Sequence, residues 1–146
     1  MARTIQIVVD TQAAHQLADW WAETLDWVVE PTDEAFIRRM IDEGFATESN
    51  TEEHRGQLVW RGTAAITSGA LGDGPNRQRI LFQDVPEAKA GKNRLHIDVR
   101  VPEVPLDQAR DALVARGATY LESGSQGPHH WHVMADPEGN EFCVSG

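Results

Sequence analysis

The chain repeats one short pattern of elements, and this repeat constrains its fold more than any other feature. Residues 4–10 alternate apolar and polar side chains as a half-buried strand does, and residues 95–101 show the same alternation. Each of these strands is followed by a helical pattern, at 12–26 and 105–116, and then by a short strand. We therefore expect two copies of one small unit within the 146 residues.

Further strands complete each copy, so that both read as a strand, a helix and three more strands. Their closing strands match as Leu81–Asp84 against Glu141–Val144, and Asp136–Gly139 has the composition of a tight turn with proline in its second position. In chain order, the predicted strands after the helix of the first copy are 27–30, one or two strands within 57–67 (57–61 and 64–67), and 78–84. Those of the second copy are 119–122, 130–135 and 140–145.

Residues 31–56 have no counterpart in the second copy. They contain a predicted helix at 32–43, for which Thr32 is the expected N-cap. The polar stretch 46–56 and the Gly-rich stretch 68–77 are predicted to be loops. The extra segment has two possible roles, as a lid over a cavity or as packing against the first sheet.

Strand alternation also predicts a polar face. Because Ile97 and Val99 turn toward the helix, His96, Asp98 and Arg100 face the other way. The same argument turns polar side chains of both copies away from their helices. We expect an α+β fold in which two βαβββ modules form a curved mixed sheet around a central cavity, the alternative being an open sheet with a solvated back face.

The predicted boundaries make the chain a single domain over 1–146. Module one covers residues 3–85 and includes the inserted helix, and module two covers residues 93–146. These lengths are sufficient for one hydrophobic core.

Composition excludes several classes of partner. There are 13 Lys and Arg residues against 23 Asp and Glu residues, a formal net charge of -10, which argues against binding to nucleic acid or to anionic lipid. The sequence has no apolar run of the length that a bilayer requires, and its amino-terminal apolar run is too short for a signal sequence. The single cysteine, Cys143, excludes an internal disulfide and suggests a cytoplasmic location.

Four segments resemble the glyoxalase-like branch of the vicinal oxygen chelate superfamily. They are Ile5–Asp10, Leu17–Trp27, Lys92–Val99 and Met134–Phe142, the last of which contains the sequence Asp-Pro-Glu-Gly-Asn before the final strand. The resemblance covers nearly the whole chain. It implies two βαβββ modules that wrap a cavity and, in the metal-dependent members, four metal ligands drawn from both modules.

Carried over by position, those ligands fall on Gln6 and His96 in the first strands. The ligand that the family supplies as Glu falls on Cys143, and its equivalent in module one is Gln83 or Leu81. Amides and a thiol suit a hard divalent ion poorly. We therefore expect no metal ligands and no cofactor, with a bound divalent metal as the alternative.

The histidines leave several roles open. His96 is the predicted catalytic residue, as a proton-transfer group, and its alternatives are a metal ligand or a cavity-lining residue. His129 is expected to lie in a loop, whereas His130 and His132 are expected to share one face of a strand, opposite Trp131 and Val133. They either line the strand entrance or reach the cavity.

Three further features have a structural and a functional interpretation. Cys143 is a buried structural thiol or a nucleophile. Trp60 belongs to the core or flanks a ligand. The basic residues Lys89, Lys92 and Arg94 are a solvated loop or hold an anionic group of a substrate.

The sequence thus predicts a glyoxalase-like protein that binds or transforms a small organic molecule, without the usual four-ligand metal site. The alternatives are a metal-dependent lyase, isomerase or dioxygenase, and a non-catalytic antibiotic-binding resistance protein of the bleomycin-resistance type. A homodimer is a further possibility. The predicted ligand-binding residues are Gln6, Trp60, Gln83, Asp98, His130, His132 and Cys143, with His96 as the catalytic residue.

Overall fold

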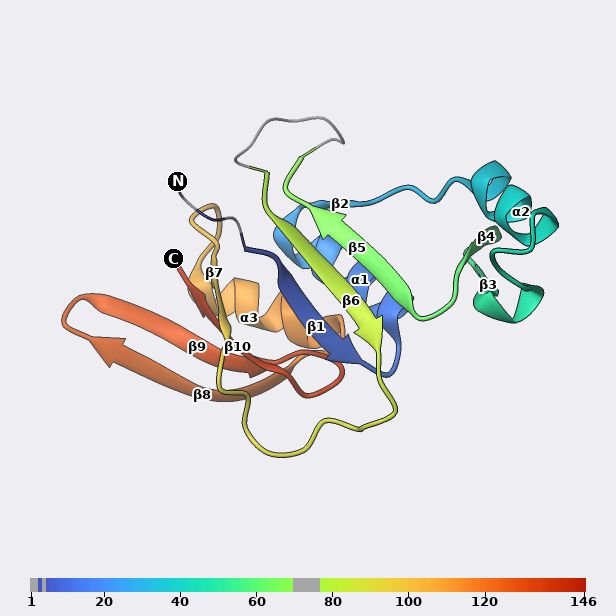
Figure 1. The fold of residues 1–146 in the computed structure, drawn as a ribbon. Coiled ribbons are helices and arrows are strands. Elements are labelled where there is room, and N and C mark those ends of the chain that lie inside the picture. Colours follow the sequence, from blue (N-terminus) through green and yellow to red (C-terminus); the bar gives the residue numbers. More distant parts are fainter. Residues whose placement is uncertain (1–2, 4, 70–76) are drawn as a thin grey trace. The chain divides into compact units, whose positions relative to one another are not determined.

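The computed structural model describes residues 3, 5–69 and 77–146. It divides into two compact units, Met1–Glu87 and Ala88–Gly146, each of which is described by itself (Figure 1). The predicted loop at 68–77 falls mainly outside the described residues. Among the described residues, no helix has both the length and the apolar character that a membrane span needs.

The first unit is built on a four-stranded mixed sheet with one long helix beside it. The strand order is β1-β6-β5-β2, with β1 parallel to β6 and the other neighbours antiparallel. The elements are β1 (Ile7–Thr11), α1 (Ala14–Leu25), β2 (Val28–Val29), β5 (Thr63–Thr67) and β6 (Arg79–Asp84).

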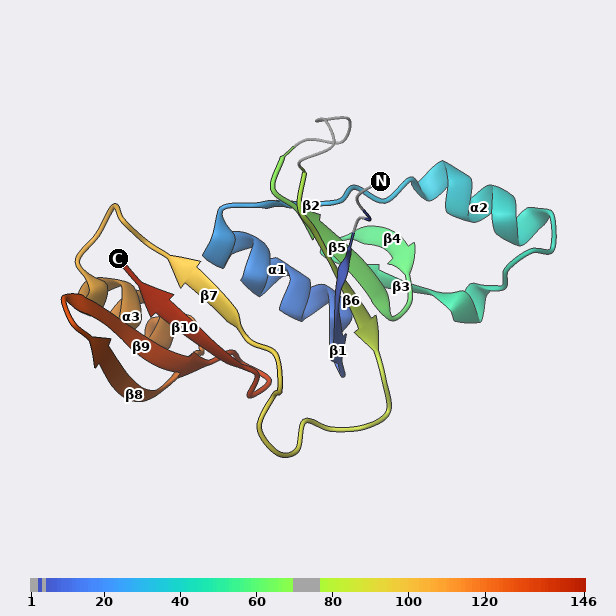
Figure 2. The same ribbon diagram turned by 60° about the vertical axis from the view of Figure 1, so that its left-hand side comes forward.

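Helix α1 packs on β5 and β6, as Figure 2 shows. Its apolar stripe, which includes Leu17, Ala18 and Trp21, is almost fully buried. Ile80 and Phe82 are buried in the sheet. Transfer of such side chains out of water stabilises a core by about 1.5–3 kcal/mol each. The start of α1 is fixed by Asp84, whose carboxylate accepts a hydrogen bond of 2.8 Å from the backbone N–H of Ala14.

The segment inserted between β2 and β5 forms a second small sheet. It contains α2 (Glu34–Asp42), a short 3-10 helix (Glu48–Asn50), and the antiparallel strands β3 (Thr51–His54) and β4 (Gln57–Trp60). The prediction of a loop over 46–56 is therefore wrong. Arg55 and Gly56 both have positive φ, 51° and 77°, as a two-residue hairpin turn requires.

The N-cap of helix α2 lies one residue later than Thr32, the predicted cap. Asp33 is the N-cap, and its carboxylate accepts a hydrogen bond from the backbone N–H of Phe36 at 3.0 Å. Aspartate suits this position because its charge also complements the helix dipole. The prediction of Thr32 as the cap is wrong by one residue.

The second unit has the same topology as the first. The strand order is β7-β10-β9-β8, with β7 parallel to β10 and the other neighbours antiparallel. The predicted α+β fold with two βαβββ modules is confirmed, and each sheet is open and mixed. The elements are β7 (Ile97–Arg100), α3 (Leu106–Ala115), β8 (Thr119–Gln126), β9 (His129–Ala135) and β10 (Glu141–Ser145).

The register of the two sheets corrects the predicted match of the closing strands. Ile7 pairs with Ile80 in module one, whereas Ile97 pairs with Phe142 in module two. When Ile7 is matched to Ile97, Phe142 corresponds to Ile80, so the closing strands are offset by two residues from the sequence match. Side chains on a strand repeat every two residues, so an offset of two leaves the apolar and polar alternation unchanged. The alternation therefore could not reveal this offset.

Candidate functional site

The candidate site lies on the face of the module-two sheet opposite α3. Asp98 on β7 pairs with Cys143 on β10, and Cys143 pairs in turn with Val133 on β9. Side chains at paired positions share a face of the sheet. The neighbouring strand positions, Val99, Phe142 and Val144, are buried on the helix side. The predicted polar face of β7 is thus present.

Three side chains on this face converge. His96, Asp98 and Cys143 each offer a nitrogen, oxygen or sulfur atom, and these atoms all lie within 4.8 Å of one another. His96 Nε2 lies 3.3 Å from Asp98 Oδ1. The side chains of His96 and Asp98 are 45% and 70% exposed, so the cluster is open to solvent and to a ligand.

The environment of Cys143 favours its thiol form. Burial raises the pKa of the thiol above its ordinary value of 9.0, and the nearby Asp98 carboxylate raises it further. Both effects disfavour a negative charge on sulfur. Without a bound cation, Cys143 is therefore protonated near neutral pH, which does not suit a nucleophile.

A hollow of about 640 Å³ surrounds this cluster. Besides the three converging side chains, His130, Trp131 and Arg100 line it. Among the described residues, Arg100 makes no ion pair or hydrogen bond through its guanidinium, so its charge is available to a ligand. A volume of this order is typical of small-molecule sites.

His132 shares a strand face with His130, opposite Trp131 and Val133, as expected, but it faces α3 and not the open side of the sheet. It pairs with Val144, which faces the helix, and only 6% of its surface is exposed. Its Nε2 donates to Asp107 Oδ1 on α3 at 2.9 Å, and Ser123 Oγ lies 2.9 Å from its Nδ1. Trp131 and Val133 occupy the open face instead, because the register with β10 pairs them with Ser145 and Cys143.

The remaining predicted residues belong to module one. Gln6 Oε1 accepts a hydrogen bond of 2.5 Å from Arg79, and Gln83 is exposed on β6. Trp60 lines a different hollow, described below. By register, Leu81 rather than Gln83 corresponds to Cys143. The assignment of Gln6, Gln83 and Trp60 to the same site as His96 stays a prediction.

Glu141 holds the loop between β6 and β7, which contains Lys89 and Asn93. Asn93 N–H donates to Glu141 Oε2 at 3.0 Å, and Lys89 Nζ lies 3.3 Å from the same carboxylate. The Asn93 N–H is the main reason that the pKa of Glu141 lies below its ordinary value, with Lys89 adding to the effect. The charge of Lys89 is thus neutralised by Glu141, which weakens the hypothesis that the basic cluster holds a substrate.

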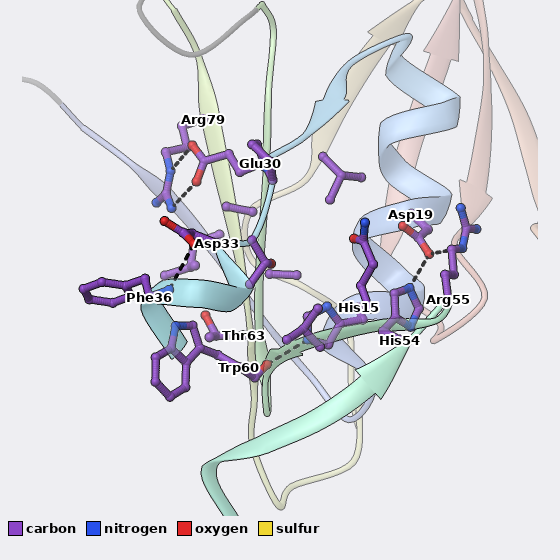
Figure 3. A pocket seen from close by; sticks show the side chains of 18 residues that line it. His15, Asp19, Glu30, Asp33, Phe36, His54, Arg55, Trp60, Thr63 and Arg79 are labelled. Carbon is purple, nitrogen blue, oxygen red and sulfur yellow. Dashed lines mark hydrogen bonds and ion pairs between the residues drawn. The ribbon is translucent and has the colours of Figure 1, made fainter. Parts of the chain in front are cut away.

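A second hollow, of about 540 Å³, lies in module one (Figure 3). Sequence reasoning missed most of its polar residues, including His15, Asp19 and His54. They come together because the β3–β4 hairpin approaches α1, and that hairpin was expected to be a loop. The one available signal was the pair Arg55-Gly56, which suits a tight turn between two short strands.

Comparison with known proteins agrees with this fold. Residues 6–145 match the family model described as a glyoxalase-like domain. The chain belongs to this family. As a glyoxalase-like domain, it falls within the vicinal oxygen chelate superfamily, as the sequence predicted. No curated protein sequence matches the chain at a significant level.

Solved structures of similar fold share little sequence with this glyoxalase-like domain, so they show the fold alone. Three of these structures are described here with their similarity to the chain. The fosfomycin resistance protein FosX from Listeria monocytogenes has a TM-score of 0.63 and 8% identity, covering 100% of this chain and 92% of that one. A putative glyoxalase family protein from Bacillus anthracis has a TM-score of 0.53 and 14% identity, covering 99% and 98%. A glyoxylase/bleomycin resistance protein/dioxygenase domain from Frankia sp. EAN1pec has a TM-score of 0.55 and 12% identity, covering 99% and 97%.

Proposed function

We propose that the open face of module two binds a small organic molecule and that His96 transfers a proton to or from it. The observation that carries this proposal is the convergence of His96, Asp98 and Cys143 in one solvent-open hollow. Imidazole side chains exchange protons near neutral pH, which makes them the commonest general acids and bases. Asp98, at 3.3 Å from His96 Nε2, orients the ring.

The lining of the hollow indicates the chemistry of the ligand. Trp131 offers an aromatic side chain for contact with carbon atoms. Arg100 offers a guanidinium group with no partner among the described residues, and such groups pair with carboxylates and other oxyanions. The ligand class we propose is therefore a small organic acid or other oxyanion-bearing molecule.

A thermal-shift screen of small carboxylates, phosphonates and ketoacids tests the proposal, and fosfomycin is included because FosX is among the solved structures of similar fold. We expect hits that raise the melting temperature of the wild type and not that of Arg100→Ala. Each hit is then incubated with wild type and His96→Gln, and its consumption is followed by NMR. Turnover that needs His96 supports catalysis. Binding without turnover supports instead a non-catalytic resistance protein. A screen in which no compound raises the melting temperature contradicts the proposal.

A bound metal is the second candidate, because the three converging atoms form a usable ligand set. The family implies a divalent metal, and nitrogen, oxygen and sulfur from His96, Asp98 and Cys143 suit Zn²⁺ better than they suit Mg²⁺ or Mn²⁺. Module one has Gln6 and Leu81 at the corresponding positions, neither of which strengthens the set. A Zn²⁺ ion held there would act as a Lewis acid toward a ligand oxygen.

Calorimetric titration of Zn²⁺ into the metal-free protein separates the two candidates. If the triad holds a metal, Zn²⁺ binds stoichiometrically, and Cys143→Ser or His96→Gln weakens the affinity by at least about tenfold. His132→Gln, on the other face of the sheet, is the matched control. If the wild type and all three variants bind Zn²⁺ with equal affinity, or if none of them binds it, the triad does not hold a metal. A homodimer and a cytoplasmic location stay predictions.

A further inference from the structure

The second hollow, in module one, is bounded in part by the inserted segment. Its walls come from α1, from β5 and β6, and from the segment that carries α2, β3 and β4. Figure 3 shows two groups of side chains in it. The aromatic rings of Phe36 and Trp60 lie on one side, and the polar cluster of His15, Asp19 and His54 lies on the other.

Several polar contacts hold the hairpin of β3 and β4 against α1. His54 Nε2 donates to Asp19 Oδ2 at 2.7 Å, and Arg55 Nε lies 3.0 Å from the same oxygen. His15 Nε2 donates to the backbone oxygen of Trp60 at 2.9 Å, and its ring stacks on His54 with the centroids 5.0 Å apart. The backbone at Trp60 is therefore held in place before any ligand arrives, which lowers the cost of binding.

The opposite wall is held by a bidentate ion pair. Arg79 Nε and Nη2 donate to the two carboxylate oxygens of Glu30, both at 2.8 Å. This pairing is the main reason that the pKa of Glu30 lies below its ordinary value. The charges of Glu30 and Arg79 thus satisfy each other, as do those of Asp19 and Arg55, and neither pair offers an open charge to a ligand.

One carboxylate oxygen in the hollow stays open. Asp33 Oδ1 caps α2, but Oδ2 has no partner among the described residues. Asp33 and the rings of Phe36 and Trp60 line the same hollow. Arg39 lies over Phe36, its guanidinium carbon 5.3 Å from the ring centroid, so this ring already accepts a cationic neighbour. Two aromatic rings near an open carboxylate form an arrangement that recognises flat molecules with positively charged N–H groups.

From this arrangement we infer that module one contains a second binding site, which takes a planar aromatic amine or amidine. The aromatic body contacts Phe36 and Trp60, and an N–H group donates to Asp33 Oδ2. The acidic character of the whole chain, with a net charge of -10, attracts such cations. The inference goes beyond the proposed function, because every residue of this site belongs to module one.

Fluorescence titration with the planar diamidine dye DAPI tests the inference, with the anionic aromatic dye ANS as the matched probe of opposite charge. DAPI should bind saturably with one site per chain, and ANS should bind at least about tenfold more weakly. Trp60→Leu and Phe36→Leu should each weaken DAPI binding by about tenfold. Asp33→Asn should weaken it by about fivefold while retaining the helix cap, because asparagine caps as well as aspartate.

Two controls separate this site from the one in module two. His96→Ala and Arg100→Ala should leave DAPI binding unchanged, and circular dichroism melting confirms that each variant folds. The inference is overturned if DAPI does not saturate, if ANS binds equally well, or if binding survives both Trp60→Leu and Asp33→Asn. Loss of DAPI binding in His96→Ala would overturn it as well, since the dye would then occupy module two.

Discussion

Asp98 and Cys143 are direct partners on the parallel strands β7 and β10, and this pairing brings a carboxylate beside the only cysteine of the chain. The carboxylate has two opposite consequences. In the metal-free protein it helps to raise the pKa of the thiol, whereas beside a bound cation both groups would act as ligands. The chemistry of Cys143 therefore reports directly on the state of the site.

The first prediction concerns the reactivity of Cys143. In the presence of a chelator, the pH midpoint for alkylation by iodoacetamide should lie above 9.0, the ordinary value for a thiol. Asp98→Asn should lower that midpoint, because it removes a negative charge that opposes the thiolate. Since Cys143 is the only cysteine, the rate reports on it alone. An unchanged midpoint in Asp98→Asn would show that the carboxylate does not act on the thiol.

The second prediction concerns acid stability. The pKa of Glu141 is depressed below 4.5 in the folded protein, mainly by the Asn93 N–H. Its contribution to the free energy of unfolding is therefore fully present above pH 4.5 and is lost as the pH falls through the folded-state pKa. Glu141→Gln should lower the free energy of unfolding at pH 7 by about 1 kcal/mol. Urea unfolding at several pH values should show this difference shrinking in acid, and a difference that grows in acid contradicts the assignment.

The third prediction tests the placement of His132. This side chain is buried and bridges Asp107 on α3 and Ser123 on β8. His132→Ala should lower the free energy of unfolding by about 2–3 kcal/mol, because it removes both contacts and leaves a gap under the helix. The exposed His130 is the matched control, and His130→Ala should change stability by no more than about 0.5 kcal/mol. Equal effects in urea unfolding would contradict the burial of His132 and the exposure of His130.

The fourth prediction concerns Gly124, which pairs with Trp131 across β8 and β9. A Cβ atom at this position would collide with the Trp131 indole ring. Gly124→Ala should therefore displace the ring, lower the free energy of unfolding by about 1–3 kcal/mol and weaken ligand binding at the open face. Ser125→Ala, on the next residue of the same strand, is the control. Unchanged stability and binding in Gly124→Ala would show that Trp131 does not pack as described.

Much of the fold follows from local patterns in the sequence. Strand alternation and helical periodicity are set by which side chains avoid water, so the repeat and the polar face of Asp98 and Arg100 were predictable. Alternation divides a strand into two faces but does not say which of them meets a helix. The sequence therefore predicted His132 on the open face of the sheet. The register with β10 instead puts Trp131 there and turns His132 toward α3.

The site in module one could not be predicted because it depends on contacts between distant segments. Thr51–His54 is polar and short, so it reads as a loop, although it pairs with β4. The ion pair of His54 with Asp19 spans 35 residues and exists only once the hairpin has formed. No local pattern encodes such a contact.

Amide NMR can show whether the open face of module two is the ligand site. A hit from the screen is titrated into isotopically labelled wild-type protein. The largest shift changes should cluster at residues 96–100, 129–131 and 143–145, and they should vanish in Arg100→Ala. Shift changes confined to module one, or scattered over both units, would contradict it.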